Sequence, residues 1–328
     1  MAHEVETMAY ANQVPWHGLG NAVNDDLTPM EMLKAASLDW SVSKRELNTV
    51  IGSIPLVDHY GLVRSSDDKV LGICGKEYIP TQNEQAFEFF ERFTKAGQMN
   101  METAGSLDGG RHVWALAKLN RGFTLGGVDR MEGYLLLSSP HIWGKSLTAM
   151  FTEIRVVCNN TLTSALNHGG ERFRMPHTKA FSAEVQQSAV TALGLSIDIL
   201  RRHEDEARVM STAVAEGELV TQFFMELFAK KTHDELFNAG ASHSDWLDQS
   251  PRTVVRLREL YHRSPGSDLK TADGTWWGAF NAVTRYVDHE MGRDRDTSLT
   301  SAWFGPRATL KQKARNLAIN NAKLVIAG

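Results

Sequence analysis

Cysteine, proline and long apolar runs are scarce in this sequence, and their scarcity excludes several classes of protein. The 328 residues include two cysteines and nine prolines. Two cysteines cannot build a disulfide scaffold or a zinc site made of Cys-x-x-Cys pairs. No apolar run approaches the roughly 18 residues of a membrane helix, and the opening MAHEVETMAYANQ lacks the apolar segment of a secretory signal. We therefore expect a cytoplasmic protein with no membrane partner.

The overall charge is slightly negative, but basic residues are segregated along the chain. Hydrophobic residues make up 42% and charged residues 23%, which is normal for a globular protein. The net charge is −4, yet residues 301–328 carry +5 and residues 141–180 carry +3, which leaves −12 for the remainder. Such segregation is typical of a phosphate-binding face on an otherwise acidic protein. A solvated helix near the end of the chain explains the C-terminal lysines equally well.

Helix and strand signals alternate in the first half of the sequence. Residues 28–38 predict a helix capped by Thr28, with Pro29 in its first turn. Residues 40–80 show strand alternation and turns, with a hairpin tip at 66–68. Residues 83–96 predict a helix, because three phenylalanines recur at three-residue spacing and a glycine follows. Strand character returns in 101–119 around an Asp-Gly-Gly turn and continues through 132–139, and residues 146–167 read as a strand followed by a helix.

The second half of the sequence is helical. From Ser182 onward strand signals vanish, and five or more segments have helical periodicity. We therefore predict an α+β fold, in which an N-terminal antiparallel β-meander with helices packed on one side is followed by a mainly helical C-terminal half. The expected domains are an α+β core over residues 1–180 and a helical region over 181–328.

Polar and basic side chains near the two positive stretches are the candidates for contacting a nucleic-acid backbone. Amide and cationic groups are the usual donors to phosphate oxygens. In the first stretch the candidates are Arg155, Asn159, Asn160, Arg172, Arg174 and Lys179, and in the second they are Lys311, Lys313 and Arg315. The two asparagines could instead cap a helix, because amide side chains often accept from a free helix N-terminus.

Three aromatic residues are the candidates for stacking on bases. Trp16 lies in the string Trp-His-Gly-Leu-Gly, whose glycines let the backbone approach a partner closely. Tyr78 precedes a predicted helix, and Trp277 belongs to an aromatic stripe on another predicted helix. Packing in a core explains a tryptophan in an N-terminal arm, or a helical aromatic stripe, without any ligand.

No motif for catalysis, metal binding or cofactor binding stands out. Cys158 has no histidine at a catalytic spacing, and His168, Glu171 and His177 match no metal-binding motif. The glycine-rich GSLDGG lacks the Gly-Lys-Ser/Thr of a phosphate-binding loop, and GxGxxG does not occur. We therefore expect no catalytic residue, metal or cofactor, and the sequence leans away from an enzyme.

Seven separated strings together resemble a known family. They are PWHGLG, GKEYIPTQNEQAF, ETAGSLDGGRHVWALAKL, RVVCNNTL, PHT, TWWGAFNAVTRYVDH and FGPRATLKQKA, in this order from about residue 3 to residue 323. This chain resembles the phage/plasmid-like proteins that carry domain of unknown function 932. The order of β-hairpins and helix is also similar to the core of single-strand annealing proteins of the RecT/Erf type, which form oligomeric rings on DNA.

These observations favour a nucleic-acid-binding protein of a mobile element. The leading hypothesis is a factor that binds or anneals single-stranded DNA during replication or recombination. One alternative is an anti-defence or interaction protein that binds a host protein, since an acidic surface can imitate DNA. A less favoured alternative is a metal-dependent enzyme on nucleic acid or nucleotide that uses His17, His177 or acidic residues with a metal. We also expect a homo-oligomer, because Leu193, Leu195, Ile197 and Leu200 are aliphatic positions open to association.

Overall fold

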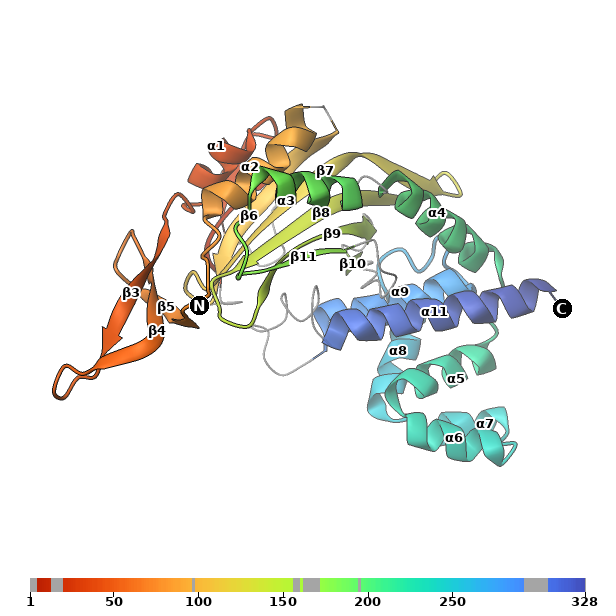
Figure 1. Cartoon of the computed structure of the whole chain (residues 1–328). Helices are drawn as coiled ribbons and strands as arrows, with labels where there is room; N and C mark the ends of the chain where they lie inside the picture. Colours follow the sequence, from red (N-terminus) through yellow and green to blue (C-terminus); the bar gives the residue numbers. More distant parts are fainter. Residues whose placement is uncertain are drawn as a thin grey trace. The chain divides into compact units, whose positions relative to one another are not determined.

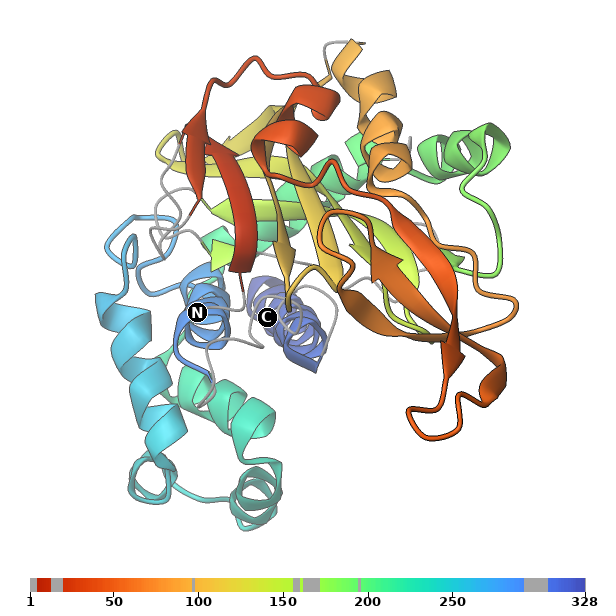
Figure 2. The same ribbon diagram turned by 90° about the vertical axis from the view of Figure 1, so that its left-hand side faces the viewer.

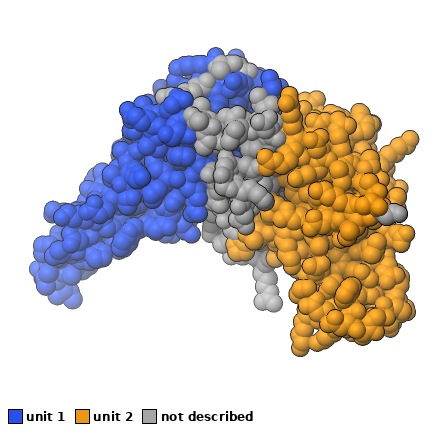
Figure 3. Space-filling view, turned by 45° about the vertical axis from the view of Figure 1, so that its right-hand side comes forward, with its two compact units in different colours: residues 1–121, 133–151, 168–196 blue, residues 122–132, 152–167, 197–328 orange. Residues whose placement is uncertain are grey.

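The computed structural model describes residues 5–12, 20–95, 98–155, 160–161, 172–193, 196–291 and 306–327. The chain forms two compact units (Figure 3): unit 1 holds residues 1–121, 133–151 and 168–196, and unit 2 holds 122–132, 152–167 and 197–328. The expected boundary at residue 180 differs from this division, because unit 1 also includes helix α3 (Ala183–Leu193) and the chain enters unit 2 earlier, at residues 122–132. Residues 122–132 contribute Phe123, Leu125 and Met131 to the hydrophobic core that the helices of unit 2 form.

An eight-stranded sheet contains most of the strands. Its order is β10-β9-β8-β7-β6-β1-β2, with β11 also paired to β9. β1 lies inside the sheet, antiparallel to β6 and parallel to the edge strand β2, and the sequence pattern did not predict it. The bounds are β1 Val5–Ala11, β2 Asn21–Val23, β6 Met99–Leu107, β7 His112–Leu125, β8 Asp129–Pro140, β9 Ser146–Arg155, β10 Asn160–Thr161 and β11 Arg172–Pro176.

The Asp-Gly-Gly turn and the end of β9 test two local predictions. The turn joins β6 to β7 as predicted, and its three residues have φ values of 52°, 60° and 89°, a region that favours glycine. β9 confirms the predicted strand from Ser146. Within the predicted helix that follows it, Asn160 and Thr161 pair with β9 as a short strand instead. The residues around that pair lie outside the described ranges.

Helices α1 (Pro29–Ala35), α2 (Asn83–Lys95) and α3 cover one face of this sheet (Figure 1). The predicted helices over 28–38 and 83–96 are confirmed. Thr28 caps α1 as expected, since its hydroxyl accepts from the Glu31 amide while the Glu31 carboxylate accepts from the Thr28 amide. In α2 the three regularly spaced phenylalanines are buried against the sheet. The predicted stop of this helix at Gly97 lies outside the described residues.

The predicted meander over residues 40–80 forms a separate antiparallel sheet of β3 (Val42–Asn48), β4 (Pro55–Arg64) and β5 (Val70–Gly75), so its last strand ends five residues earlier than predicted. Its outer end, the β3–β4 hairpin, extends beyond the third strand (Figure 2). The pairing register moves from Glu46 opposite Tyr60 to Asn48 opposite Pro55, so residues 56–59 of β4 bulge out of the ladder with β3, although His59 still pairs with Gly75 of β5. The Gln82 side chain holds the inner end by accepting from the Val42 amide and donating to its carbonyl.

Unit 2 is built mainly of helices, which confirms the predicted α+β organisation with a helical C-terminal half. Helices α5, α8, α9 and α11 pack together around buried aromatic and aliphatic side chains. No helix among the described residues is long and apolar enough to cross a membrane. The helices are α4 Ser196–Thr212, α5 Gly217–Phe228, α6 Lys230–Asn238, α7 His243–Asp248, α8 Arg252–Arg263, α9 Trp276–His289 and α11 Pro306–Ala327.

Candidate functional site

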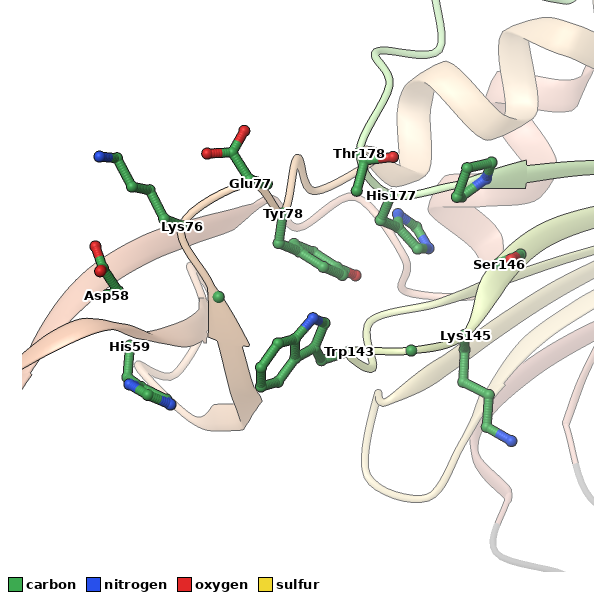
Figure 4. A pocket seen from close by; sticks show the side chains of 13 residues that line it. Asp58, His59, Lys76, Glu77, Tyr78, Trp143, Lys145, Ser146, His177 and Thr178 are labelled. Carbon is green, nitrogen blue, oxygen red and sulfur yellow. The ribbon is translucent and has the colours of Figure 1, made fainter.

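Unit 1 has an open pocket of about 550 Å³, which we call the Trp143 pocket (Figure 4). Four chain segments that are distant in the sequence meet there: the β4 bulge, the turn after β5, the turn between β8 and β9, and the end of β11. The lining residues are Asp58, His59, Gly75, Lys76, Glu77, Tyr78, Trp143, Gly144, Lys145, Ser146, Pro176, His177 and Thr178.

Two of these segments come from the three-stranded sheet. The β4 bulge presents Asp58 and His59, and the left-handed φ of Asp58 (59°) turns the backbone at this point. The His59 ring is held by a 2.9 Å hydrogen bond between its Nδ1 and the Val57 carbonyl oxygen. After β5 ends at Gly75, the amide of Tyr78 donates to the Gly75 carbonyl, and this turn places the side chains between them at the rim.

Trp143 is an exposed large hydrophobic side chain in the lining of the pocket. It lies in the tight β8–β9 turn, which closes with a hydrogen bond from the Lys145 amide to the Ile142 carbonyl and includes Gly144 at φ +80°. The side chain is 56% exposed. Its indole packs edge-on against His59, with ring centroids 6.3 Å apart, and lies 3.1 Å from where a Cβ on Gly75 would stand. The rest of the indole is open to a ligand.

Tyr78 and His177 form the buried floor of the pocket. Their rings stack at 4.8 Å with an interplanar angle of 21°, and the Tyr78 hydroxyl donates to the Pro140 carbonyl over 3.4 Å. Burial raises the pKa of the Tyr78 phenol and lowers the pKa of His177. Both side chains are therefore neutral near pH 7, and the floor adds no charge to the pocket.

The charged side chains that line the pocket lie at its rim. Lys76 and Lys145 supply two exposed ammonium groups, while Asp58 and Glu77 supply two exposed carboxylates. Over the ranges that the structure describes, no group of three or more His, Cys, Asp or Glu side chains could hold a metal ion. An open indole bordered by cations is suited to holding a planar ring that carries negative groups.

Two of the predicted phosphate-contacting residues lie beside this pocket. Arg174 is exposed on β11, and because strand side chains alternate between faces, it shares a face with Pro176 of the lining. Lys179 is exposed in the turn that follows, where its amide donates to the Pro176 carbonyl. The predicted Arg155, Asn160 and Arg172 belong to strands, but their side chains fall outside what the structure describes.

Several other predicted residues also fall outside the described part of the chain. Trp16 and Asn159 are among them, so the structure does not place either one. The same holds for the side chains of Leu193, Leu195, Ile197 and Leu200, which were expected to associate between subunits.

The predicted C-terminal basic strip is largely internal to unit 2. Lys311 is 1% exposed, and its ammonium lies 2.7 Å from the Asp288 carboxylate. Arg315 is also buried and pairs with Glu206 at 2.6 Å. Only Lys313 is exposed, with its ammonium 3.5 Å from the Glu226 carbonyl. Two of the three cations therefore neutralise acidic partners inside the unit rather than facing solvent.

Of the aromatic residues predicted to stack, Tyr78 and Trp277 are buried, whereas an aromatic residue that the sequence did not indicate is exposed. The Trp277 indole donates a 2.9 Å hydrogen bond to the buried Asp129 carboxylate, and its ring is part of the unit 2 core. Tyr78 is buried at the floor of the Trp143 pocket. Trp143 was missed, although its string His-Ile-Trp-Gly-Lys places an aromatic residue beside a turn glycine and a lysine. An aromatic residue in so short a turn is the signal that could have found it.

Comparison with known proteins gives a family and no function. A family profile described as "Domain of unknown function (DUF932)" matches residues 70–319, which include every pocket-lining residue except Asp58 and His59. A search of curated proteins and a search of solved structures each gave no match. The chain therefore belongs to the family that carries domain of unknown function 932, as its ordered motifs predicted.

Proposed function

We propose that unit 1 binds single-stranded DNA at the Trp143 pocket. Trp143 stacks on one base, and Lys76 and Lys145 contact the phosphates on either side of it. The observation that carries this proposal is the half-exposed indole in an open pocket whose rim includes Lys145 on the same turn and Lys76 on the turn after β5. Aromatic rings combined with cationic side chains are the usual means of holding single strands.

The exposed cations on β11 extend this site beyond the pocket. Arg174 is two residues from Pro176 at the pocket edge, a separation of about 6.6 Å along a strand. Lys179 follows on the other side of the lining residues His177 and Thr178. When one base of a single DNA strand occupies the pocket, the phosphates of the neighbouring nucleotides would contact these two cations.

The shape of the site favours a single strand over a duplex. Stacking on Trp143 requires a base whose face is free, and bases in a duplex stack on one another. Every base has a face that can stack on the indole, so we expect weak sequence preference. Binding of this kind is what an annealing factor in replication or recombination needs, and we extend the proposal to that role.

Fluorescence anisotropy with labelled oligo(dT), and with a duplex of the same length, tests the proposal at low and moderate salt. The expected result is preference for the single strand and a loss of about 5- to 150-fold in affinity for Trp143→Ala, since stacking contributes about 1–3 kcal/mol per base. Phe237→Ala, which removes a 65% exposed aromatic ring on unit 2, is the matched control and should change little. Equal losses in both variants, or no binding at low salt, would reject the proposal.

The two rim carboxylates favour a second candidate, which is a basic segment of a host protein. Asp58 and Glu77 are exposed at the rim of the same pocket, and a basic peptide could pair with them while one of its arginines stacks on Trp143. Asp58→Asn distinguishes the candidates, because it should strengthen or preserve binding to a polyanion and weaken binding to a basic peptide. If DNA binding is absent, captured host proteins should be compared between wild type and this variant.

A further inference from the structure

The outer end of the β3–β4 hairpin, residues 48–57, carries several exposed aliphatic side chains, and we call it the aliphatic tip. Every residue in it is exposed. Its five aliphatic side chains, with exposed fractions, are Val50 (101%), Ile51 (88%), Ile54 (62%), Leu56 (38%) and Val57 (78%). Scattered exposed apolar residues are ordinary, but five of them within ten consecutive residues are typical of an interaction surface.

The tip has little to hold it in place within its own unit. It contains two strand ends and a turn, with Gly52 and Ser53 in the left-handed region and no third strand beside it. The amide of Thr49 donates to the Ile54 carbonyl, and the Thr49 hydroxyl accepts from the Ile54 amide. A two-stranded hairpin of this kind is only marginally stable alone, so burial of its apolar side chains against a partner would stabilise it.

Charge indicates which kind of partner suits the tip. Residues 47–57 contain no charged side chain, and the residues that bound them, Glu46 and Asp58, are both acidic. A DNA backbone or an anionic membrane would meet two negative charges and no free cation here, which disfavours both. An uncharged aliphatic surface is instead suited to the buried centre of a protein–protein interface.

We propose that the aliphatic tip is a dimerisation element that packs on the aliphatic tip of a second copy of this chain. In a two-fold symmetric dimer each copy contributes the same surface to the interface. Because residues 47–57 contain no charged side chain, this contact places no like charges opposite one another at the centre of the interface. Specific interfaces begin at roughly 1,000 Å² of total buried surface. Ten largely exposed aliphatic residues, five from each copy, supply area of that order. This inference is independent of DNA binding.

The first test is sedimentation velocity over a concentration series without DNA. Wild type should show a reversible monomer–dimer equilibrium, and Ile51→Glu should weaken the dimer at least tenfold. Ile51 is 88% exposed, so its replacement should leave the circular dichroism and melting temperature unchanged. Leu324→Glu, at a 71% exposed aliphatic position on α11, is the matched control and should dimerise as wild type does.

A second test locates the contact directly. Ser53→Cys places a thiol in the turn of the tip, and an oxidant should convert this variant to a disulfide-linked dimer in which the two thiols lose two electrons and two protons to the oxidant. The parent chain under the same oxidant controls for its own two cysteines. A wild type that stays monomeric at all concentrations, an Ile51→Glu dimer of unchanged affinity, or vesicle binding by a monomer would overturn the proposal.

Discussion

Arg64 on β4 lies 2.8 Å from Glu6 on β1, and this ion pair joins the three-stranded sheet to the large sheet of unit 1. The same guanidinium forms two parallel hydrogen bonds with the Asp67 carboxylate in the β4–β5 turn and lies over the Trp40 ring. Its side chain is 8% exposed. Hydrogen bonds from this guanidinium lower the pKa of Asp67 to about 2.

Replacing Arg64 should destabilise unit 1 substantially. Arg64→Met removes the nearer cation of the partly buried Glu6 and leaves it only Lys69 at 4.0 Å, so we expect a loss of about 2–4 kcal/mol in the free energy of unfolding, measured by urea denaturation. Arg256→Met breaks a more exposed pair with Glu259 and Glu290, and should cost under about 1 kcal/mol. Similar losses of stability in both variants would show that the burial of Arg64 does not determine how much its ion pairs contribute to the free energy of unfolding.

Local patterns predicted α1, α2, the Asp-Gly-Gly turn and the helical character of the second half, but they did not predict which charges are buried. The Thr28 cap and the phenylalanine spacing of α2 depend on neighbours within a few residues, and both predictions were confirmed. Lys311 and Arg315 were read as exposed because their partners, Asp288 and Glu206, are distant in the sequence. A local signal was nevertheless present, since both cations share the helix face of the buried alanines 308, 314, 318 and 322.

The two features that the sequence did not predict have different causes. β1 was missed because its side-chain alternation is weak and a bulge between Val5 and Thr7 interrupts its pairing with β6. The Trp143 pocket was missed because its four segments come together only through sheet pairing and the β4 bulge. A pattern confined to a short window cannot show that His59 and Trp143 are neighbours.

Asp129 should be a main anchor between the β7–β8 hairpin and the helices of unit 2. Its buried carboxylate accepts from the Trp277 indole at 2.9 Å and from the Thr271 hydroxyl at 3.0 Å. Asp129→Ala leaves both buried donors without this acceptor, and we expect it to lower the free energy of unfolding by about 2–4 kcal/mol. Asp129→Asn should lose less, because the amide oxygen still accepts. The exposed Asp248→Ala is the control, and a loss below about 0.5 kcal/mol for Asp129→Ala would contradict this role.

Unit 1 should lose stability in mild acid because it buries neutral histidines. Burial lowers the pKa of His141 to about 3 and that of His112 to about 4. The unfolded chain therefore binds more protons than the folded chain below about pH 6.5, so stability present above that pH is lost as the pH falls. The free energy of unfolding, measured from about pH 7 to about pH 5, should have a slope that is up to about 1.4 kcal/mol per pH unit smaller in His141→Gln. Equal slopes in wild type and variant would contradict the assignment.

Filling the space beside Trp143 should impair the site without removing any side chain from it. A Cβ on Gly75 would lie 3.1 Å from the Trp143 Cζ2 atom, and the branched side chain in Gly75→Val would need more room. We expect this variant to displace the indole and to weaken binding of oligo(dT) nearly as much as Trp143→Ala, with Gly75→Ala intermediate. Gly144→Ala, where a Cβ meets nothing within 4 Å, tests turn strain alone, since its φ is +80°. Full affinity in Gly75→Val would show that the position of the indole does not matter.

The lysines at the rim should set the salt dependence of DNA binding. For a single strand, the slope of log affinity against log salt is roughly −0.7 for each phosphate neutralised. Lys76→Gln and Lys145→Gln should therefore each make the slope less steep by about 0.7, and the double variant by about 1.4. Lys231→Gln, at an exposed lysine of α6, should leave the slope unchanged. Because Trp143→Ala removes stacking and no charge, it should lower the affinity at every salt concentration while keeping the wild-type slope. A parallel change of slope in the tryptophan and lysine variants would mean that the DNA is held elsewhere, with the pocket affecting it only indirectly.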